Sequence, residues 1–545
     1  MFKLSEYPRI YVKLKLFAWL LLLFVIFSPG ITRAQVRDIT WDISNINDVL
    51  RMAAANYVDS VDISKLSVVA IKSILKELDP YSFYIPPQQK KSNDETFSGQ
   101  FEGIGIQFAI MNDTINVISA ISGGPSKELG ILPGDKIVII DSADATNLTN
   151  EDVIAKLKGP KGTKVSVEIK REGTNGLLHF EIIRDKIPIF SVDAAVIVPK
   201  TDIGYISLSK FIATTHSEIS DSLRMLKNRG MKRLILDLRG NPGGYMDQAI
   251  AVVNEFVPAG SEIVSTKGRN SALNQTVYAG SSAHYLDLPL IILIDAGSAS
   301  ASEIVAGAIQ DLDRGLIVGE TSFGKGLVQR QYDLDGGAAF RLTTSKYFTP
   351  SGRCIQRDYK DEKRWKEMTD RLDLQEGDNL NHELERLEKQ SEGDTNTFIF
   401  KTKNGRKVLG GGGISPDFVV KYDTLTPLFR QLRSKNIFYH FSSAYLTENK
   451  TTLTGLYKNN FDLFNSDFNL TNNNIDLLKK LAQAAGVEWN DEDFKKDSIV
   501  ICTLLKANIA KNIWDNNEYQ TVLITTNKQA MKAIELFPSA SKFLK

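Results

Sequence analysis

The chain has 545 residues, of which 42% are hydrophobic and 24% are charged. These globular proportions exclude collagen-like and largely disordered chains, and the length predicts about three to five domains. Lysine and arginine (66) balance aspartate and glutamate (65), so no basic field is present to attract nucleic acid. The two cysteines lie far apart and the five histidines lack ligand-like spacing, so we expect no disulfide scaffold and no metal site. No organic cofactor is implied by the sequence.

Residues 1–34 have the pattern of a secretory signal peptide. Lys13 and Lys15 precede an apolar run over 16–27, and small residues precede a cleavage position after Ala34. The run is shorter than the ~20 residues that cross a bilayer, so we expect cleavage rather than a retained anchor. The mature protein is therefore predicted to be soluble and exported, most simply to a bacterial periplasm.

Residues 35–97 are predicted to form a small helical domain. Apolar residues recur at helical spacing over 46–53 and again over 66–78. The second helix is expected to end at Asp79, because the proline that follows cannot continue it.

From 98 to 186 the apolar residues recur with a period of two, which predicts strands. A hairpin over 104–118 and one helix over 150–158 follow from this pattern. With Gly130 and the Pro-Gly-Asp block at 133–135, the segment resembles a PDZ domain.

The resemblance implies that the loop before the second PDZ strand binds a peptide's terminal carboxylate through backbone N–H groups. This loop consists of Gly103, Ile104, Gly105 and Ile106, and its glycines would permit the close approach. The alternative is that the glycines serve only a tight turn. Arg171, at the end of a later PDZ strand, is a candidate for coupling the PDZ domain to the core of the domain that follows it, and the alternative is an exposed strand-end arginine.

Residues 187–425 contain the motifs that could support catalysis. Two apolar runs, 233–238 and 289–294, are predicted to be buried strands with polar turns at their carboxyl ends. An Asn-Pro-Gly-Gly turn (241–244) follows the first, and a Gly-Ser-Ala-Ser-Ala-Ser stretch (297–302) follows the second. A predicted helix comes after each turn, so a serine hydroxyl would lie where free helical N–H groups stabilise a developing oxyanion.

These blocks, followed by Gly-Lys-Gly at 324–326, resemble in their order the carboxy-terminal processing (tail-specific) peptidases, which are serine proteases with a Ser–Lys dyad. The likeness extends from about residue 78 to residue 417. It implies a multidomain α+β protein with a crotonase-like α/β protease core, a PDZ β-barrel and helical flanks.

By this resemblance Ser300 is the nucleophile, Lys325 is its base and Gln329 orients the amine. The residues make chemical sense by themselves, because a serine hydroxyl is a poor nucleophile until a neighbour takes its proton. To act as that base near pH 7, a lysine needs a pKa about 3 units below its reference value. Burial among apolar neighbours lowers a lysine pKa by such amounts.

The implied oxyanion donors are the N–H groups of Ala301 and of Gly243, which we prefer to Gly244. Ser298 and Ser302 are the next candidates for the nucleophile, and their alternative role is helix capping. A Ser–His–Asp enzyme built on His216 is a weaker alternative, because no motif selects that histidine.

The sequence beyond the motifs predicts an exposed, charged insertion over 357–397 and a helical packing extension over 426–545. The expected partners are unfolded or tail-exposed protein substrates, with an adaptor or regulatory protein as a further candidate. Two other functions remain open. A catalytically inactive PDZ scaffold would need no Lys325, and a crotonase-fold enzyme acting on thioesters would need no exported PDZ domain.

Overall fold

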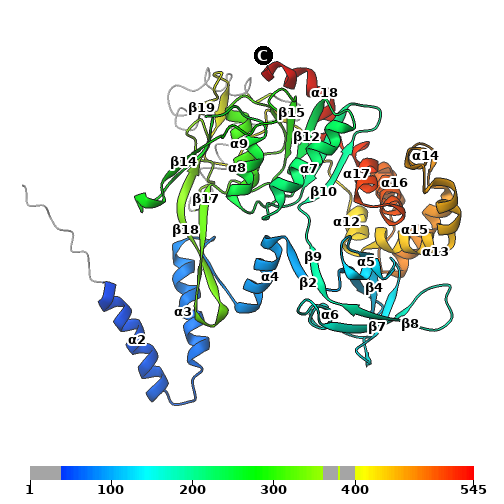
Figure 1. The fold of residues 1–545 in the computed structure, drawn as a ribbon, viewed down its shortest axis with the longest axis horizontal. Coiled ribbons are helices and arrows are strands. Elements are labelled where there is room, and N and C mark those ends of the chain that lie inside the picture. Colours follow the sequence, from blue (N-terminus) through cyan, green and yellow to red (C-terminus); the bar gives the residue numbers. More distant parts are fainter. Residues whose placement is uncertain (1–38, 360–378, 381–398, 545) are drawn as a thin grey trace, which may run out of the picture. The chain divides into compact units, whose positions relative to one another are not determined.

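The computed structural model describes residues 39–359, 379–380 and 399–544. The predicted signal peptide and almost all of the predicted insertion lie outside the described residues. The chain divides into two units, residues 1–84 and 85–545, which we describe separately (Figure 1). Within the described ranges, no helix combines the length and the apolar composition needed to cross a bilayer.

The first unit contains two helices, α2 (Ile39–Asn56) and α3 (Ile63–Leu78), in the region predicted to be helical. Asp62 begins α3, and its side chain accepts a hydrogen bond from the Lys65 N–H at 3.0 Å. Asp79 ends α3 in an extended conformation, as expected for the residue before a proline. A short strand, β1 (Phe83–Ile85), comes next in the chain.

The second unit begins with α4 (Pro87–Ser98), which ends at Gly99 in the left-handed conformation, with φ of 79°. The next strand, β2 (Gln100–Gly103), pairs antiparallel with β9 (Asp185–Pro188). The segments that enter and leave the predicted PDZ domain therefore run side by side as a two-stranded stem.

The chain between β2 and β9 forms an antiparallel sheet with the strand order β3-β4-β5-β7-β8, and β6 pairs with β5. Its elements are β3 (Ile106–Met111), β4 (Thr114–Ala120), α5 (Pro125–Glu128), β5 (Lys136–Ile140), β6 (Ala143–Asp144), α6 (Asn150–Leu157), β7 (Lys164–Lys170) and β8 (Leu178–Ile183). Alternate residues of β7 (Val165, Val167 and Ile169) are buried in the domain's own core, which explains the period of two in the sequence. β3 lies at the edge of this sheet.

A central sheet with the order β10-β11-β12-β15-β16-β21 carries the motif-bearing turns. Its strands are β10 (Val192–Ile197), β11 (Ile203–Leu208), β12 (Arg233–Asp237), β15 (Leu290–Ile294), β16 (Leu316–Gly319) and β21 (Phe418–Val419). All neighbouring pairs are parallel except β10 with β11. Because β12 and β15 are parallel neighbours, the turns after them lie at the same edge of the sheet.

The two predicted buried strands, β12 and β15, are covered on both faces. Leu234 and Ile292 pack into a core with α7 (Thr215–Asn228), α8 (Met246–Asn254) and α9 (Ala301–Asp311). Their chain neighbours Ile235 and Ile291 pack into a second core that contains residues of α18 (Lys528–Ala540). A strand buried on both faces consists of a continuous run of apolar residues, and the sequence has such a run in both places.

A smaller antiparallel sheet packs beside the central one. It includes β13 (Glu262–Lys267), β14 (Gln275–Tyr278), β17 (Leu327–Asp333) and β18 (Ala339–Phe348), with short helical turns η1 (Ser271–Leu273) and η2 (Asp335–Gly337). β19 (Ile399–Lys401) and β20 (Lys407–Leu409) form a separate hairpin. The long β17–β18 hairpin follows the Gly-Lys-Gly loop directly.

The C-terminal region is helical, as predicted. It contains α12 (Pro427–Ser434), α13 (Ile437–Tyr457), α14 (Phe461–Asp467), α15 (Asn472–Ala484), α16 (Asp491–Ile513), α17 (Asn516–Ile524), α18 and η3 (Ser541–Leu544). The helices from α12 to α16 share their own hydrophobic core. By contrast, α18 lies against β12, β15 and β16 of the central sheet (Figure 1).

Candidate active site

The turns after β12 and β15 are hydrogen-bonded to each other. The Asn241 carbonyl accepts the N–H of Ala299 at 3.0 Å and the hydroxyl of Ser302 at 2.9 Å. The Gly240 N–H donates to Asp295 Oδ1 at 2.8 Å. The structure therefore brings together the Asn-Pro-Gly-Gly turn and the serine-rich loop, the two segments in which the oxyanion donors were predicted.

Ser300 occupies the N-cap position of α9 with φ of 55° and ψ of −109°. A non-glycine residue with positive φ is strained, and such strain tends to occur at functional sites. The Ser300 N–H donates to Glu303 Oε2 at 2.8 Å, and the carbonyl of Ser300 accepts the hydroxyl of Tyr347 at 3.1 Å. These contacts hold the serine at the exposed end of a helix whose residues are otherwise buried.

The two neighbouring serines are engaged in structural hydrogen bonds. The Ser298 hydroxyl donates to the Leu238 carbonyl at 2.8 Å, and the Ser302 hydroxyl donates to the Asn241 carbonyl. Both side chains are completely buried, whereas Ser300 is partly exposed. Of the three serines, Ser300 alone is accessible to a substrate.

Lys325 lies in the loop between β16 and β17, and its Nζ donates to Gln329 Oε1 at 2.7 Å. The glycines on either side are required by close packing. A Cβ at Gly324 would lie 2.9 Å from Arg357 Cβ, and a Cβ at Gly326 would lie 2.7 Å from the Gln356 nitrogen. The predicted pair of Lys325 and Gln329 is thus in contact.

Glu303, which is not among the predicted site residues, joins the two halves of the site. Its Oε2 accepts the N–H of Ser300 at 2.8 Å and the N–H of Lys325 at 2.9 Å. Its Oε1 accepts the N–H of Gly324 at 2.7 Å and the hydroxyl of Ser322. One carboxylate oxygen therefore fixes the backbones of the predicted nucleophile and the predicted base next to each other.

The environment of Glu303 has opposing electrostatic effects. Complete burial raises the pKa of this carboxyl above its ordinary value, while the hydrogen bonds that it accepts act to lower it. The sequence contained a signal for this residue, because Ser300-x-x-Glu303 is a capping-box pattern.

Glu303→Gln is expected to lower the turnover number about ten- to a hundredfold, because one N–H₂ group would replace an oxygen that accepts two donors. Misplacing reacting groups by about 1 Å can cost roughly a hundredfold. Ser322→Ala, which removes one of the four donors, should cost less. Initial rates per folded molecule, with the folded fraction measured by thermal unfolding, would check this. Equal rates for Glu303→Gln and wild type would contradict it.

The predicted oxyanion turn approaches Ser300 closely. A Cβ at Gly243, where φ is +96°, would lie 2.7 Å from the Ala299 carbonyl oxygen and 2.9 Å from the Ala301 nitrogen. Only glycine fits there.

The amide of Gly243 is already engaged, because it donates to Asn241 Oδ1 at 2.9 Å. The Gly243 carbonyl accepts the N–H of Phe211 at 3.0 Å. The peptide bond between Gly243 and Gly244 is trans, so its carbonyl and its N–H point in opposite directions. Because the carbonyl points toward the Phe211 N–H, the Gly244 N–H points away from it. In this conformation the predicted donor, Gly243, would have to release Asn241 before it could bind an oxyanion, and the N–H of Gly244 is the other donor of the turn.

The predicted carboxylate-binding loop of the PDZ domain has one glycine with positive φ, Gly105 at 76°. The carbonyl of Ile104 accepts the N–H of Ser126 at 3.1 Å, and the carbonyl of Gly105 accepts the N–H of Ile121 at 2.8 Å. Because carbonyl and N–H point in opposite directions across a trans peptide, the N–H groups of Gly105 and Ile106 point away from those partners. Gly103, the first residue of the predicted loop, ends β2 and is buried.

Arg171 lies inside the PDZ domain. Its Nε and Nη2 donate to the two oxygens of Asp135, each at 2.7 Å, and Nη2 also donates to the Gly130 carbonyl at 2.8 Å. Among the described residues, its side-chain hydrogen bonds all stay within this domain. Coupling of the PDZ domain to the protease core through Arg171 stays a prediction.

His216 lies on α7 and contacts Glu255, with 2.8 Å between Nε2 and Oε1. Glu255 is also bound by Ser220 and by His284. The geometry thus gives His216 the carboxylate of Glu255 as its partner. Within the described part of the chain, no group of three or more histidine, cysteine or acidic side chains is arranged to hold a metal ion.

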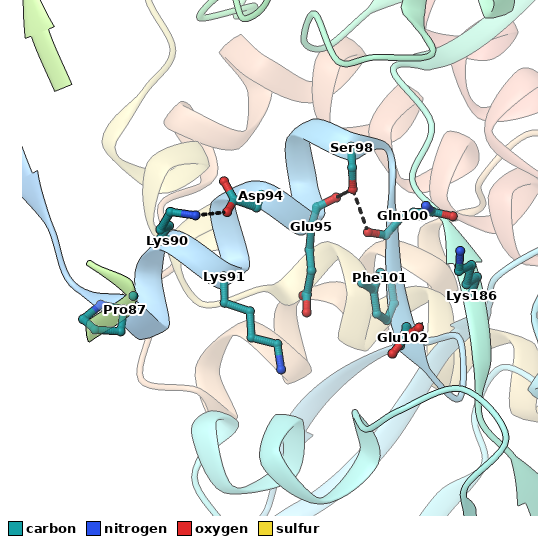
Figure 2. Close-up of a pocket in the computed structure, with 11 residues that line it drawn as sticks. Pro87, Lys90, Lys91, Asp94, Glu95, Ser98, Gln100, Phe101, Glu102 and Lys186 are labelled. Atoms are coloured by element: carbon teal, nitrogen blue, oxygen red, sulfur yellow. Dashed lines mark hydrogen bonds and ion pairs between the residues drawn. The ribbon is translucent and has the colours of Figure 1, made fainter. Parts of the chain in front are cut away.

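A cavity of about 670 Å³ lies beside α4 and β2 (Figure 2). Its charged lining residues are Lys90, Lys91, Asp94, Glu95, Glu102 and Lys186, and Lys90 is paired with Asp94 at 2.8 Å. None of the predicted site residues lines it. Because acidic and basic groups alternate around it, no single ligand charge is favoured.

Comparisons with known proteins identify the family of the chain. A sequence model of peptidase family S41 matches residues 202–362, and one of the PDZ domain matches residues 96–170. The chain is 37% identical over 338 residues to a carboxy-terminal-processing protease of Bartonella bacilliformis, which covers 61% of this chain and 76% of that protein. It is 35% identical over 329 residues to the carboxy-terminal processing protease CtpA of Bacillus subtilis, with coverage of 60% and 69%.

The chain belongs to the carboxy-terminal processing proteases of peptidase family S41. The predicted family, the serine-type peptidase activity and the α+β fold class with a PDZ domain are thereby confirmed. A solved photosystem II D1 C-terminal processing protease is 27% identical, with a TM-score of 0.32 and coverage of 57% of this chain and 89% of that one. Residues 428–515 match a family of unknown function, DUF8443.

Proposed function

We propose that this serine peptidase is an exported endopeptidase that uses Ser300 as nucleophile and Lys325 as general base, and that its PDZ domain captures substrate tails. The observation that carries the proposal is the pair of hydrogen bonds to Glu303 Oε2, from the N–H of Ser300 and from the N–H of Lys325. One buried carboxylate oxygen thus binds the backbone of both the proposed nucleophile and the proposed base.

The proposed chemistry has two stages. The neutral amine of Lys325 takes the hydroxyl proton while Ser300 Oγ attacks the scissile carbonyl, and the resulting ammonium gives that proton to the leaving amine. Water then attacks the acyl-enzyme and loses a proton to Lys325. The ester bond to Ser300 breaks, the ammonium of Lys325 returns the proton to Ser300 Oγ, and the carboxylic acid product leaves. Gln329 Oε1 accepts a hydrogen bond from Nζ and so directs the lone pair of the neutral amine.

The oxyanion of each tetrahedral intermediate would be stabilised at the amino terminus of α9. The Ala301 N–H is in the first turn of this helix, where N–H groups lack intrahelical acceptors. The second donor comes from the Asn-Pro-Gly-Gly turn, which packs directly against the serine loop. The sequence favoured Gly243 for this role, and the bond from Gly243 to Asn241 makes Gly244 an equal candidate.

The PDZ domain is proposed to hold the free carboxyl terminus of an unfolded or tail-exposed protein. β3 at the sheet edge would pair with an extended peptide, while Gly105 and Ile106 direct N–H groups toward its carboxylate. The sequence signal at 1–34 supports export to a periplasm as the place of action. Incubating the mature protein with an unfolded protein, and identifying the products by mass spectrometry, tests the hydrolytic part of the proposal.

Amidation of a substrate's terminus is expected to weaken tail binding about ten- to a hundredfold. The change removes a charge-assisted hydrogen bond, and such bonds contribute roughly 1.5–3 kcal/mol. Binding of matched free-acid and amidated peptides to the full Ser300→Ala chain, which avoids cleavage during titration, measures the difference.

Two glycine variants locate this effect in the loop. Gly105→Ala should weaken free-acid binding, because its Cβ would lie 3.0 Å from Ile187 Cδ1 and 3.2 Å from Gly124 Cα. Gly173→Ala has a similar positive φ of 78° but meets no atom within 4 Å, so it controls for backbone strain alone. Equal affinities for the free-acid and amidated peptides would rule out carboxylate capture by this loop.

A further inference from the structure

We infer that Asn527 and Gln529, at the start of α18, are positioning residues for proteolysis, because they hold the side chain of Arg239 and thereby the turn beside Ser300. The inference rests on the proposed oxyanion role of that turn. It assigns to the C-terminal helical region a part in the reaction, although the last proposed catalytic residue, Gln329, lies about two hundred residues earlier in the chain.

Arg239 is the hub of the contact. Its side chain is only 9% exposed. Its Nε donates to Asp237 Oδ1 at 2.8 Å, and its Nη1 donates to Asn527 Oδ1 and to Gln529 Oε1, both at 2.8 Å. A guanidinium has five N–H donors in a fixed plane, so two acceptors from α18 and one carboxylate from β12 fix its orientation.

The two acceptors are themselves held in place. Asn527 is the N-cap of α18, and its Oδ1 also accepts the N–H of Ala530 at 2.9 Å. Gln529 is 1% exposed, and its Nε2 donates to the Val420 carbonyl at 2.7 Å. Neither side chain can leave Arg239 without losing a second hydrogen bond.

A neighbouring helix supports the same strand end. Tyr205 donates its hydroxyl hydrogen bond to Asp237, the carboxylate that pairs with Arg239, and the Gln520 Nε2 on α17 donates to the Tyr205 hydroxyl oxygen at 2.8 Å. Two C-terminal helices therefore converge on the end of β12.

From Arg239 the chain leads directly to the reacting groups. The next residue, Gly240, donates its N–H to Asp295 Oδ1, and the carbonyl of Asn241 accepts the N–H of Ala299 at 3.0 Å. Ala299 is adjacent to Ser300. A shift of Arg239 thus moves the two loops whose relative placement sets the oxyanion geometry.

A purely structural role for α18 makes a different prediction. The apolar side of α18, including Leu536, covers one face of the central sheet. If α18 only contributed packing, removing an apolar contact and removing the Arg239 acceptors would change stability alone. A positioning role requires a loss of turnover per folded molecule.

The test compares two double variants that differ in a single acceptor. In Asn527→Ser/Gln529→Leu, serine still caps α18 but is too short to reach Arg239, so both acceptors are lost. In Asn527→Asp/Gln529→Leu, aspartate also caps the helix and keeps one acceptor for Arg239. We expect kcat to fall about ten- to a hundredfold in the double variant with serine, with KM nearly unchanged. In the double variant with aspartate, kcat should recover most of the way to the wild-type value.

Leu536→Ala, which is remote from Arg239, is the control for packing. It should lower the melting temperature but leave kcat per folded molecule close to that of wild type. Equal kcat values in the two double variants would overturn the positioning role. So would a fall of kcat in Leu536→Ala as large as that in the double variant with serine, at the same folded fraction. Wild type and Ser300→Ala are assayed beside these proteins. Absence of Ser300-dependent cleavage would overturn the proposed function as well, whereas an active enzyme indifferent to the acceptors would overturn this inference alone.

Discussion

Ser300→Ala is expected to abolish proteolysis while leaving the fold intact. In the proposed mechanism this hydroxyl forms the acyl-enzyme, and the neighbouring hydroxyls of Ser298 and Ser302 are buried and bonded to main-chain carbonyls. Because nucleophile and base act as one unit, Lys325→Ala should be equally inactive, and the double variant should be no worse than either single one. Initial rates on an unfolded protein, with circular dichroism to establish folding, measure all three.

The two adjacent serines provide matched controls for this result. Ser298→Ala and Ser302→Ala remove buried hydroxyls that bond to main-chain carbonyls, so each should lower the free energy of unfolding by about 1–3 kcal/mol. Both should retain cleavage within roughly an order of magnitude per folded molecule. If Ser300→Ala kept substantial activity and one of these controls lost it, the nucleophile would be reassigned to that serine.

The central sheet and its motif-bearing turns were predictable because the signals are local. The apolar run over 289–294 is long enough for a buried strand, and the small residues after it can form only a turn before the next helix. The order of the blocks along the chain then identified the family. Contacts between the blocks were not predictable in the same way.

Glu303 shows why one essential contact was missed. Its Ser-x-x-Glu capping pattern was visible in the sequence, but three of its four partners, the Ser322 hydroxyl and the Gly324 and Lys325 amides, lie in a loop about twenty residues further along. A capping pattern predicts only the local bonds. The role of Glu303 as the link between nucleophile and base depends on how two loops meet in space.

Arg171 illustrates a contact that strand register determines. β5 and β7 are antiparallel, with Lys136 opposite Lys170, so Asp135 and Arg171 lie just beyond one paired position. Knowledge of that register would have predicted the ion pair within the PDZ domain. The sequence alone left the register open, and Arg171 was therefore given only a choice between an exposed position and a contact with the core.

The C-terminal extension was predicted as packing, which describes α12 to α16 but is incomplete for α18. β12 and β15 are apolar on both faces, so a second layer was required on the side away from α9. Nothing in the helical pattern of residues 528–540 states which surface its apolar side covers. The polar contacts of Asn527 with Arg239 follow from that docking and were invisible in the sequence.

Lys325→Arg is expected to be as inactive as Lys325→Ala, and this variant separates a lysine base from a histidine base. Arginine keeps the positive charge and the approximate reach, but its guanidinium does not lose a proton at any relevant pH. His216→Ala should remain close to wild type in rate per folded molecule, because the proposed base is Lys325 and not His216. The measurement is initial-rate hydrolysis of one unfolded substrate between about pH 5 and 10 for the four proteins. Since only the neutral amine accepts a proton, wild-type activity should fall as the pH drops through the pKa of the base and persist at mildly alkaline pH. An active Lys325→Arg enzyme, or a folded but inactive His216→Ala enzyme, would refute the Ser–Lys mechanism.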